Sequence, residues 1–319
     1  MRRISVAQLF EAQRERLQLS HVSGRLDAQL SVSDDAIWGA DLVGHLNLIH
    51  PTRLQILGTA ELAWARRQPD DKVAHHLNEI LSAQPPALIV ADGCEPPPSV
   101  LVACGTHGVA LLTTTEPSAS VIDHLRLYLS RQLAERISLH GVFMDVLGVG
   151  VLITGDSGAG KSELALELIS RGHGLVADDV VEFSRITPTV LEGRCPEMLQ
   201  DFIEVRGLGI LNIRTVFGET ACRRKMRLRL VAHLERRQPG TNDPLRLPMQ
   251  HERQAILGVQ VQRVVLPVAA GRNLAVLLET AVRSAILQLR GIDSTQDFIE
   301  RQTRALEHGA DRGDGDVGD

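Results

Sequence analysis

The chain has 319 residues, 44% of them hydrophobic and 23% charged, which is the composition of an ordinary soluble protein long enough for two domains. A formal net charge of −5 argues against a partner held by overall neutralisation of nucleic-acid phosphates, so we expect no nucleic acid. No run of about 18 apolar residues could span a membrane, and charged residues interrupt the N-terminus where a signal peptide needs an apolar core.

The first 130 residues or so alternate helical and strand-like patterns. Apolar spacing predicts helices over residues 6–17 and 54–65, and a buried strand over residues 87–91. The CEPPPS stretch breaks regular structure, and the segment after it predicts a helix or strand, a turn from Gly105 to Gly108, and a second apolar strand. Residues 118–135 have helical spacing and lead into the next module. We therefore predict an N-terminal α/β domain over residues 1–132, joined to the rest by this helix.

Residues 146–174 combine an apolar strand, a glycine-rich loop and an amphipathic helix. The loop matches the Walker A pattern GxxxxGK[ST]. Its glycines allow the backbone to fold around phosphate oxygens, Lys161 can reach the outer phosphates, and Ser162 can coordinate Mg²⁺. The alternative is a fortuitous glycine turn, but only three lysines occur in the chain and one falls at this position. The predicted nucleotide-binding residues are Gly155, Asp156, Ser157, Gly158, Ala159, Gly160, Lys161 and Ser162.

Two adjacent carboxylates follow the loop at short range. The pattern predicts a helix over residues 163–170, closed by Gly172, and then one strand over residues 175–183 that contains Asp178 and Asp179. One carboxylate near the outer phosphate can accept the proton of an attacking hydroxyl, while the other orients water or Mg²⁺. A solvated turn is the alternative interpretation.

Further along, two charged residues stand in an apolar stretch. Glu204 and Arg206 are two positions apart, which predicts a buried pair on one face of a strand, either as magnesium ligand and phosphate-binding guanidinium or as a structural ion pair. Strands are also predicted over residues 228–232 and 261–268, and a last helix over 273–289. Gly271 and Arg272 lie between that strand and that helix, where an anion can bind.

The composition of the remaining segments supports three smaller expectations. The tail over residues 309–319 is predicted to be disordered. The basic run over residues 223–230 fits a strand with one solvated basic face, which is an ordinary exposed strand or a docking face for an acidic partner. The four cysteines lack metal-ligand spacing, so we expect free buried thiols and a cytoplasmic protein.

Several of these motifs occur in one order, together with His140 and Gly141, the stretch RGHGLVADDVV, the stretch IEVRGLGILN and the stretch PVAAGRNLAV. In this combination the chain resembles the HPr kinase/phosphorylase family. The similarity extends to HPTRLQILGTAELAW and to Glu95–Pro97 in the N-terminal half, and so covers nearly the whole chain.

The resemblance implies a P-loop kinase domain over residues 133–308 with a core like that of phosphoenolpyruvate carboxykinase. It implies an enzyme that phosphorylates a serine of the phosphocarrier protein HPr with ATP, and reverses this with inorganic phosphate to give pyrophosphate. Regulation of the phosphotransferase system and of carbon metabolism, and a homohexamer, are also implied.

The family's residue roles fall on matching positions of this sequence. Asp179 becomes the proton acceptor in the kinase direction and the donor in reverse, and Ser162 and Glu204 become magnesium ligands. The segment that matters chiefly for dephosphorylation corresponds to Pro267, Val268, Ala269, Ala270, Gly271 and Arg272. The full catalytic set is His140, Lys161, Asp179 and Arg246. A nucleotide-gated regulator, a nucleic-acid ATPase and a small-molecule kinase stay open as alternatives.

Overall fold

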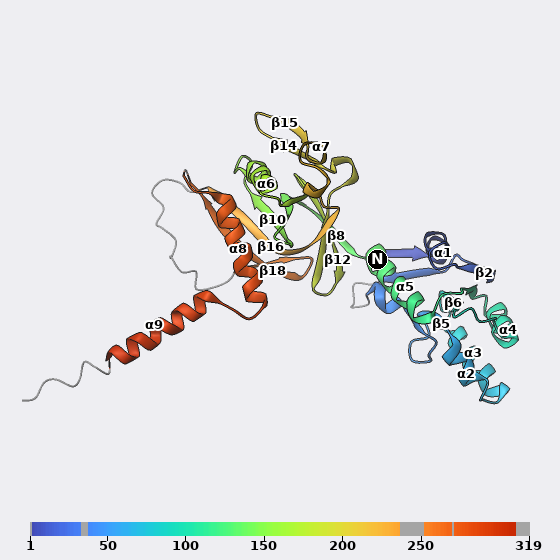
Figure 1. Cartoon of the computed structure of the whole chain (residues 1–319). Coiled ribbons are helices and arrows are strands. Elements are labelled where there is room, and N and C mark those ends of the chain that lie inside the picture. Colours follow the sequence, from blue (N-terminus) through green and yellow to red (C-terminus); the bar gives the residue numbers. More distant parts are fainter. Residues whose placement is uncertain (1, 33–37, 237–251, 270, 311–319) are drawn as a thin grey trace, which may run out of the picture. The chain divides into compact units, whose positions relative to one another are not determined.

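The computed structural model describes residues 2–32, 38–236, 252–269 and 271–310 (Figure 1). The chain divides into two compact units, Met1–Glu135 and Arg136–Asp319. Each unit has its own apolar clusters and its own central sheet.

The N-terminal unit alternates strands and helices. Its elements are β1 (Arg2–Ser5), α1 (Val6–Gln13), β2 (Ser20–Ser23), β3 (Gln29–Val32), β4 (Val43–His45), β5 (Leu54–Leu57), α2 (Thr59–Ala65), α3 (Asp70–Ser82), β6 (Ala87–Val90), α4 (Pro98–His107), β7 (Ala110–Thr113) and α5 (Ser118–Gln132). The central sheet has the order β2-β7-β6-β5-β4, in which β4 to β7 are parallel neighbours and β2 is antiparallel to β7.

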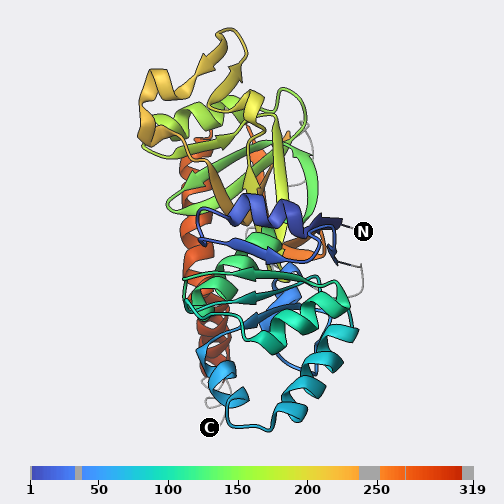
Figure 2. The same cartoon turned by 90° about the vertical axis from the view of Figure 1, so that its right-hand side faces the viewer.

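Helices cover both faces of this sheet (Figure 2). Along β6, Ala87 and Ile89 pack with α1 and α5, whereas Leu88 and Val90 pack with α2, α3 and α4. Successive strand residues point to opposite faces, so a strand covered on both faces must be apolar throughout. This explains why the sequence of β6 is continuously apolar, and it confirms the strand predicted there.

Two predictions for this unit were wrong. Residues 54–65 form β5 and then α2, not one helix, because residues 54–57 are buried on both sides of the sheet while the helix begins only after Gly58. Gly105 lies inside α4, and the turn is made by Gly108 alone, which has the left-handed φ of 67° that glycine adopts without strain.

The C-terminal unit begins with β8, whose first residue is the last of the N-terminal unit. Its elements are β8 (Glu135–His140), β9 (Val142–Val146), β10 (Val149–Gly155), α6 (Lys161–Ser170), β11 (Gly174–Ala177), β12 (Val180–Thr187), β13 (Val190–Arg194), β14 (Phe202–Val205), β15 (Gly209–Asn212), α7 (Ile213–Phe217), β16 (Lys225–Arg236), β17 (Glu252–Ile256), β18 (Val259–Val268), α8 (Leu274–Leu289) and α9 (Ser294–Ala310).

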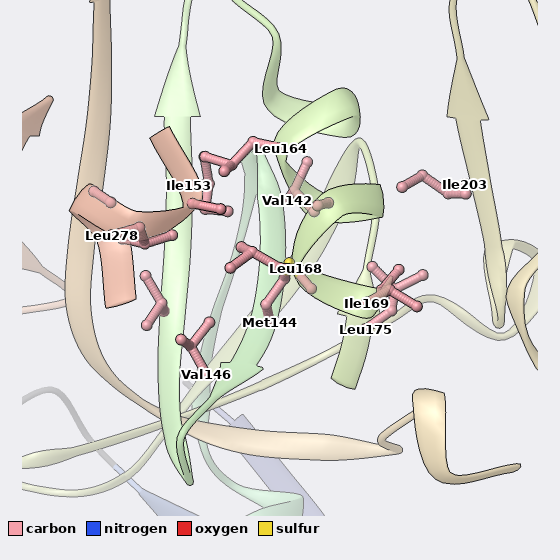
Figure 3. Packing of buried hydrophobic residues seen from close by; sticks show 14 of the residues in the cluster. Val142, Met144, Val146, Ile153, Leu164, Leu168, Ile169, Leu175, Ile203 and Leu278 are labelled. Carbon is pink, nitrogen blue, oxygen red and sulfur yellow. The ribbon is translucent and has the colours of Figure 1, made fainter. Parts of the chain in front are cut away.

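In the part of the chain described, these strands form a nine-stranded mixed sheet and a separate β14–β15 hairpin. Three neighbours, β10, β16 and β18, run parallel, so their carboxyl ends lie at one edge. One face of the sheet packs against α6 and α8, as Figure 3 shows for Met144, Ile153, Leu168 and Leu278. The opposite face is covered by a second apolar cluster that includes Phe143 and Phe183.

The predicted strand over residues 175–183 is interrupted. It forms β11 and β12, separated by Asp178 and Asp179, because Asp179 has a left-handed φ of 64° that no strand accommodates. The strand predictions over residues 228–232 and 261–268 are confirmed, although both strands are longer. Helix α8 begins after its cap, Asn273, as the pattern predicts.

The smaller expectations have mixed outcomes. Lys225, Arg227 and Arg229 are exposed along β16, which confirms the solvated basic face. All four cysteines are free, and all but Cys94 are buried. Helix α9 extends to Ala310, so the first two residues of the expected tail are helical, while residues 311–319 lie outside the described residues.

Candidate active site

The phosphate loop connects the carboxyl end of β10 to the N-terminus of α6. Gly155 ends the strand opposite Leu234, and a Cβ on Gly155 would lie only 2.6 Å from the Leu234 carbonyl oxygen. Only glycine permits this close approach. The ammonium of Lys161 donates hydrogen bonds to the carbonyl oxygens of Gly155 and Asp156, each at 2.9 Å. The strand, loop and helix therefore form the predicted module, with the lysine folded over the loop.

Asp178 lies against the first turn of α6. Its carboxylate accepts a hydrogen bond from the Ser162 hydroxyl at 3.4 Å and another from the Glu204 backbone N–H at 2.9 Å. The residue is 7% exposed, and burial raises the pKa of Asp178, although these hydrogen bonds and one from the Asp179 N–H oppose that rise. The structure thus places a buried carboxylate beside the serine predicted to bind Mg²⁺.

Asp179 occupies the exposed tip of the turn between β11 and β12. Its backbone carbonyl accepts a hydrogen bond from the Gly141 N–H, which brings the end of β8 alongside. The Asp179 Oδ1 is consequently 3.6 Å from the His140 Nδ1, and the two side chains are 76% and 85% exposed. The structure brings together these two residues, which are 39 positions apart in the sequence. Both side chains are therefore open to solvent.

The expected buried pair of Glu204 and Arg206 is wrong. Both residues are exposed, and β14 ends at Val205, so Arg206 lies in the hairpin turn. No ion pair joins them among the described residues. The strand is too short to hold both side chains on one face. Glu204 instead contributes its backbone N–H to Asp178.

Arg206 and Arg236 both approach the phosphate loop. A Cβ on Gly158 would lie 3.3 Å from Arg236 Nη2 and 3.5 Å from Arg206 Nη1, and the Arg236 guanidinium donates to the Gly158 carbonyl. Sequence reasoning missed Arg236 because the predicted strand stopped four residues too early. Arg236 could have been found as a basic residue at the carboxyl end of the apolar strand that runs parallel to the phosphate-loop strand.

Val268, Gly271 and Arg272, from the segment predicted to matter for dephosphorylation, also reach this edge. Arg236 pairs with Val268 in the parallel register of β16 and β18. A hollow of about 480 Å³ lies between the start of α6 and this segment, lined by Gly160, Glu163 and Arg272 among others. The predicted phosphate segment is thus next to the phosphate loop. Ala270 and Arg246 lie outside the described residues.

The donor set suits a hard cation bound together with phosphate. The Ser162 hydroxyl and the Asp178 carboxylate are oxygen donors of the kind that Mg²⁺ prefers. Among the described residues there is no group of three or more histidine, cysteine or acidic side chains that could hold a metal ion by itself. Mg²⁺ commonly binds through one or two carboxylates plus substrate phosphates, so these residues fit that arrangement.

Comparison with known proteins identifies the family. The model of the HPr Serine kinase C-terminal domain matches residues 131–302, and that of the HPr Serine kinase N terminus matches residues 4–129. The chain belongs to the HPr kinase/phosphorylase family. A relative named HPr kinase/phosphorylase from Azoarcus sp. (strain BH72) is 77% identical over 316 residues, covering 99% of each chain. The relative of the same name from Bordetella pertussis is 53% identical and covers 95% of this chain and 98% of its own.

A solved structure adds one further match. The Hpr(Ser) kinase/phosphatase from Coxiella burnetii is 35% identical, covers 51% of this chain and 98% of its own, and has a TM-score of 0.46. The family membership confirms the predicted fold class, an N-terminal α/β domain followed by a P-loop kinase domain. No helix within the described residues is long and apolar enough to cross a membrane.

Proposed function

We propose that this chain is an ATP-dependent protein-serine kinase of the phosphocarrier protein HPr that also removes the phosphoryl group by phosphorolysis. The catalytic domain in this proposal spans residues 133–308. Family membership supports the reaction, and one geometric observation carries it. The exposed carboxylate of Asp179 follows directly after Asp178, which contacts the phosphate-loop Ser162.

ATP binds in this proposal with its outer phosphates in the phosphate loop. The backbone N–H groups of residues 155–162 and the N-terminus of α6 favour the phosphate charge, and Lys161 leaves the loop carbonyls to contact the phosphates. Ser162, Asp178 and the side chain of Glu204 would hold Mg²⁺, whose chemistry is neutralisation of charge on the phosphate oxygens.

In the kinase direction, Asp179 accepts the proton of the substrate serine hydroxyl. The serine oxygen forms a bond to the γ-phosphorus of ATP, the bond to the β–γ bridging oxygen breaks, and ADP leaves. His140, 3.6 Å from Asp179, orients the carboxylate. Because Asp179 is 76% exposed, a serine on the surface of a folded protein can reach it, which favours a protein substrate over a small metabolite.

In the reverse direction, inorganic phosphate attacks the phosphoserine. A phosphate oxygen bonds to the phosphoserine phosphorus, the serine oxygen leaves with a proton from Asp179, and pyrophosphate forms. Arg272 and the rest of the 267–272 segment hold the attacking phosphate beside the phosphate loop. Arg246 completes the proposed catalytic set, and its role is assigned from the family resemblance alone.

HPr is the proposed partner, and the assembly is proposed to be a homohexamer in the cytoplasm that regulates the phosphotransferase system and carbon metabolism. No nucleic-acid ligand is part of this proposal, in keeping with the net charge of −5. Sedimentation of the purified protein tests the hexamer.

The decisive experiment assays both directions on one preparation. Wild-type protein should transfer labelled phosphate from ATP to a serine of purified HPr, and should release pyrophosphate from that product only when phosphate is added. Asp179→Asn should lower kinase turnover by about 100-fold or more while ATP still binds. Asp71→Asn, an exposed carboxylate in α3, is the matched control. Release of orthophosphate without phosphate dependence would overturn the phosphorylase assignment.

A further inference from the structure

The N-terminal unit contains a hollow of about 800 Å³ that the proposed reaction does not use. Its walls come from the segment after β4, the end of β5, helices α2 and α3, and residues 95–100 after β6. It therefore lies outside the carboxyl ends of three neighbouring parallel strands, between those ends and the helices that cover one face of the sheet. Its volume is within the range of about 300–1,000 Å³ that is usual for small-molecule sites.

One wall of the hollow is held in place by a buried side chain. Gln55 is 0% exposed, and its amide nitrogen donates to the carbonyl oxygens of His50, Pro51 and Arg53 at 2.9–3.2 Å. Its amide oxygen accepts from the Asn47 N–H at 3.1 Å. Each of these bonds fixes the loop after β4, so this wall is formed without a ligand.

A second wall is fixed by Asp92, just beyond β6. The Asp92 carboxylate accepts hydrogen bonds from the Thr59 N–H and hydroxyl at 2.6 and 2.9 Å, and from the Ser118 N–H at 2.6 Å. These bonds attach the first turn of α2 to the end of β6. The hollow is thus bounded by rigid elements, as pre-organised binding sites are.

The lining combines an apolar floor with an aromatic rim. The floor consists of the buried side chains Leu57, Leu62, Leu77, Ile80 and Val100. Trp64 stands at the rim, 43% exposed, with its ring edge-to-face to that of His76 at a centroid distance of 5.8 Å. Such a surface suits an apolar or aromatic body and leaves an indole face for a cation.

The charged groups of the lining are mainly acidic. The lining includes three carboxylates, those of Glu61, Asp70 and Glu95, and one guanidinium, that of Arg66. The Glu61 carboxylate accepts a hydrogen bond from the Gly58 N–H and lies 3.2 Å from Nδ1 of His45, which is outside the hollow. Asp70 and Glu95 have no side-chain hydrogen bond or ion pair within the described ranges. They are available to a positively charged ligand.

We propose that this hollow binds a small molecule with an apolar, aromatic body and one ammonium group. The body lies on the leucine floor against Trp64, and the ammonium pairs with Glu95 at the rim. The site belongs to the N-terminal unit alone and is independent of the phosphate loop.

A series of three compounds with one body and different charge tests the proposal. The chain has two tryptophans, so Trp38→Phe leaves Trp64 as a local fluorescence probe. This variant is titrated with 4-phenylbutylamine, 4-phenylbutanol and 4-phenylbutyrate, and calorimetry on the wild-type chain repeats the titrations without the substitution. The amine should give a saturable change and bind at least about tenfold more tightly than the alcohol or the acid.

Two variants test whether the carboxylate of Glu95 itself pairs with the ammonium group. Glu95→Gln should reduce the affinity for the amine to that for the alcohol, whereas Glu79→Gln, a carboxylate on α3 outside the hollow, should leave it unchanged. Absence of saturable binding by the amine, equal or tighter binding of the acid, or an unaltered amine affinity in Glu95→Gln would each overturn the proposal.

Discussion

Replacing Asp178 by asparagine and by alanine separates its structural role from its chemical one. In Asp178→Asn the side-chain oxygen can still accept from the Glu204 N–H, and the new amide can donate to the Ser162 hydroxyl, which rotates to accept. In Asp178→Ala the Glu204 N–H loses this acceptor. We therefore expect the alanine variant to be destabilised by about 1–3 kcal/mol. The asparagine variant should unfold at nearly the same urea concentration as wild type at pH 7, because it keeps these hydrogen bonds and removes a charge that burial disfavours.

The two variants should nevertheless share a defect in magnesium use. Both lack the negative charge beside Ser162, and in the asparagine variant the amide occupies one of the two lone pairs of the Ser162 hydroxyl oxygen. The Mg²⁺ concentration for half-maximal kinase turnover should rise by about 10–100-fold in both. The assay is a magnesium titration of HPr phosphorylation beside urea unfolding, with the exposed carboxylate variant Glu197→Gln as control. The reasoning would be refuted if Asp178→Asn had the magnesium dependence of wild type, or if Asp178→Asn unfolded at as low a urea concentration as Asp178→Ala.

The pH dependence of unfolding provides a separate check on the same residue. Burial raises the pKa of Asp178 above the ordinary value of 3.8, so the native state takes up a proton that the unfolded chain does not. The ionised carboxyl therefore costs stability above its folded pKa, and this cost disappears as the pH falls toward the ordinary value. As the pH falls from 7 to 4, the free energy of unfolding of the wild-type chain should rise relative to that of Asp178→Asn.

Three further predictions follow from other contacts. Asp92→Asn should lower the free energy of unfolding of the N-terminal unit by about 1–3 kcal/mol. Burial acts to raise the pKa of Asp92, but its hydrogen bonds hold this pKa below the ordinary value of 3.8, so the ionised carboxyl stabilises the fold. The wild-type chain should lose this advantage only as the pH falls below 3.8, in urea titrations followed by the fluorescence of the two tryptophans, which both lie in the N-terminal unit. The hydrogen bond from His173 lowers the pKa of Glu279, so Glu279→Gln should be less stable than wild type at pH 7 and approach it as the pH falls below 4.5 in thermal melts. Arg236→Gln should raise the KM for ATP and for phosphate by about tenfold with unchanged thermal unfolding, and unchanged kinetics would remove Arg236 from the site.

The local sequence pattern was sufficient to predict the features that are formed by residues adjacent in the sequence. The phosphate loop over residues 155–162 was identified from its glycines and its lysine, because eight consecutive residues contain both the required backbone freedom and the charge. The buried strand β6 and helix α8 were likewise visible, since a continuous apolar run and a 3.6-residue period reflect burial directly.

Tertiary structure decided which distant groups meet. The parallel register of β10, β16 and β18 places Arg236 and Val268 at the edge where the phosphate loop begins. The position of β8 beside β12 in the sheet, with a hydrogen bond from the Gly141 N–H to the Asp179 carbonyl, brings His140 to Asp179. The left-handed turn at Asp179 also depends on that environment, and the sequence suggested an unbroken strand instead. Strand order and register depend on which apolar faces pack together, and composition and spacing within one segment contain no record of the partner segment.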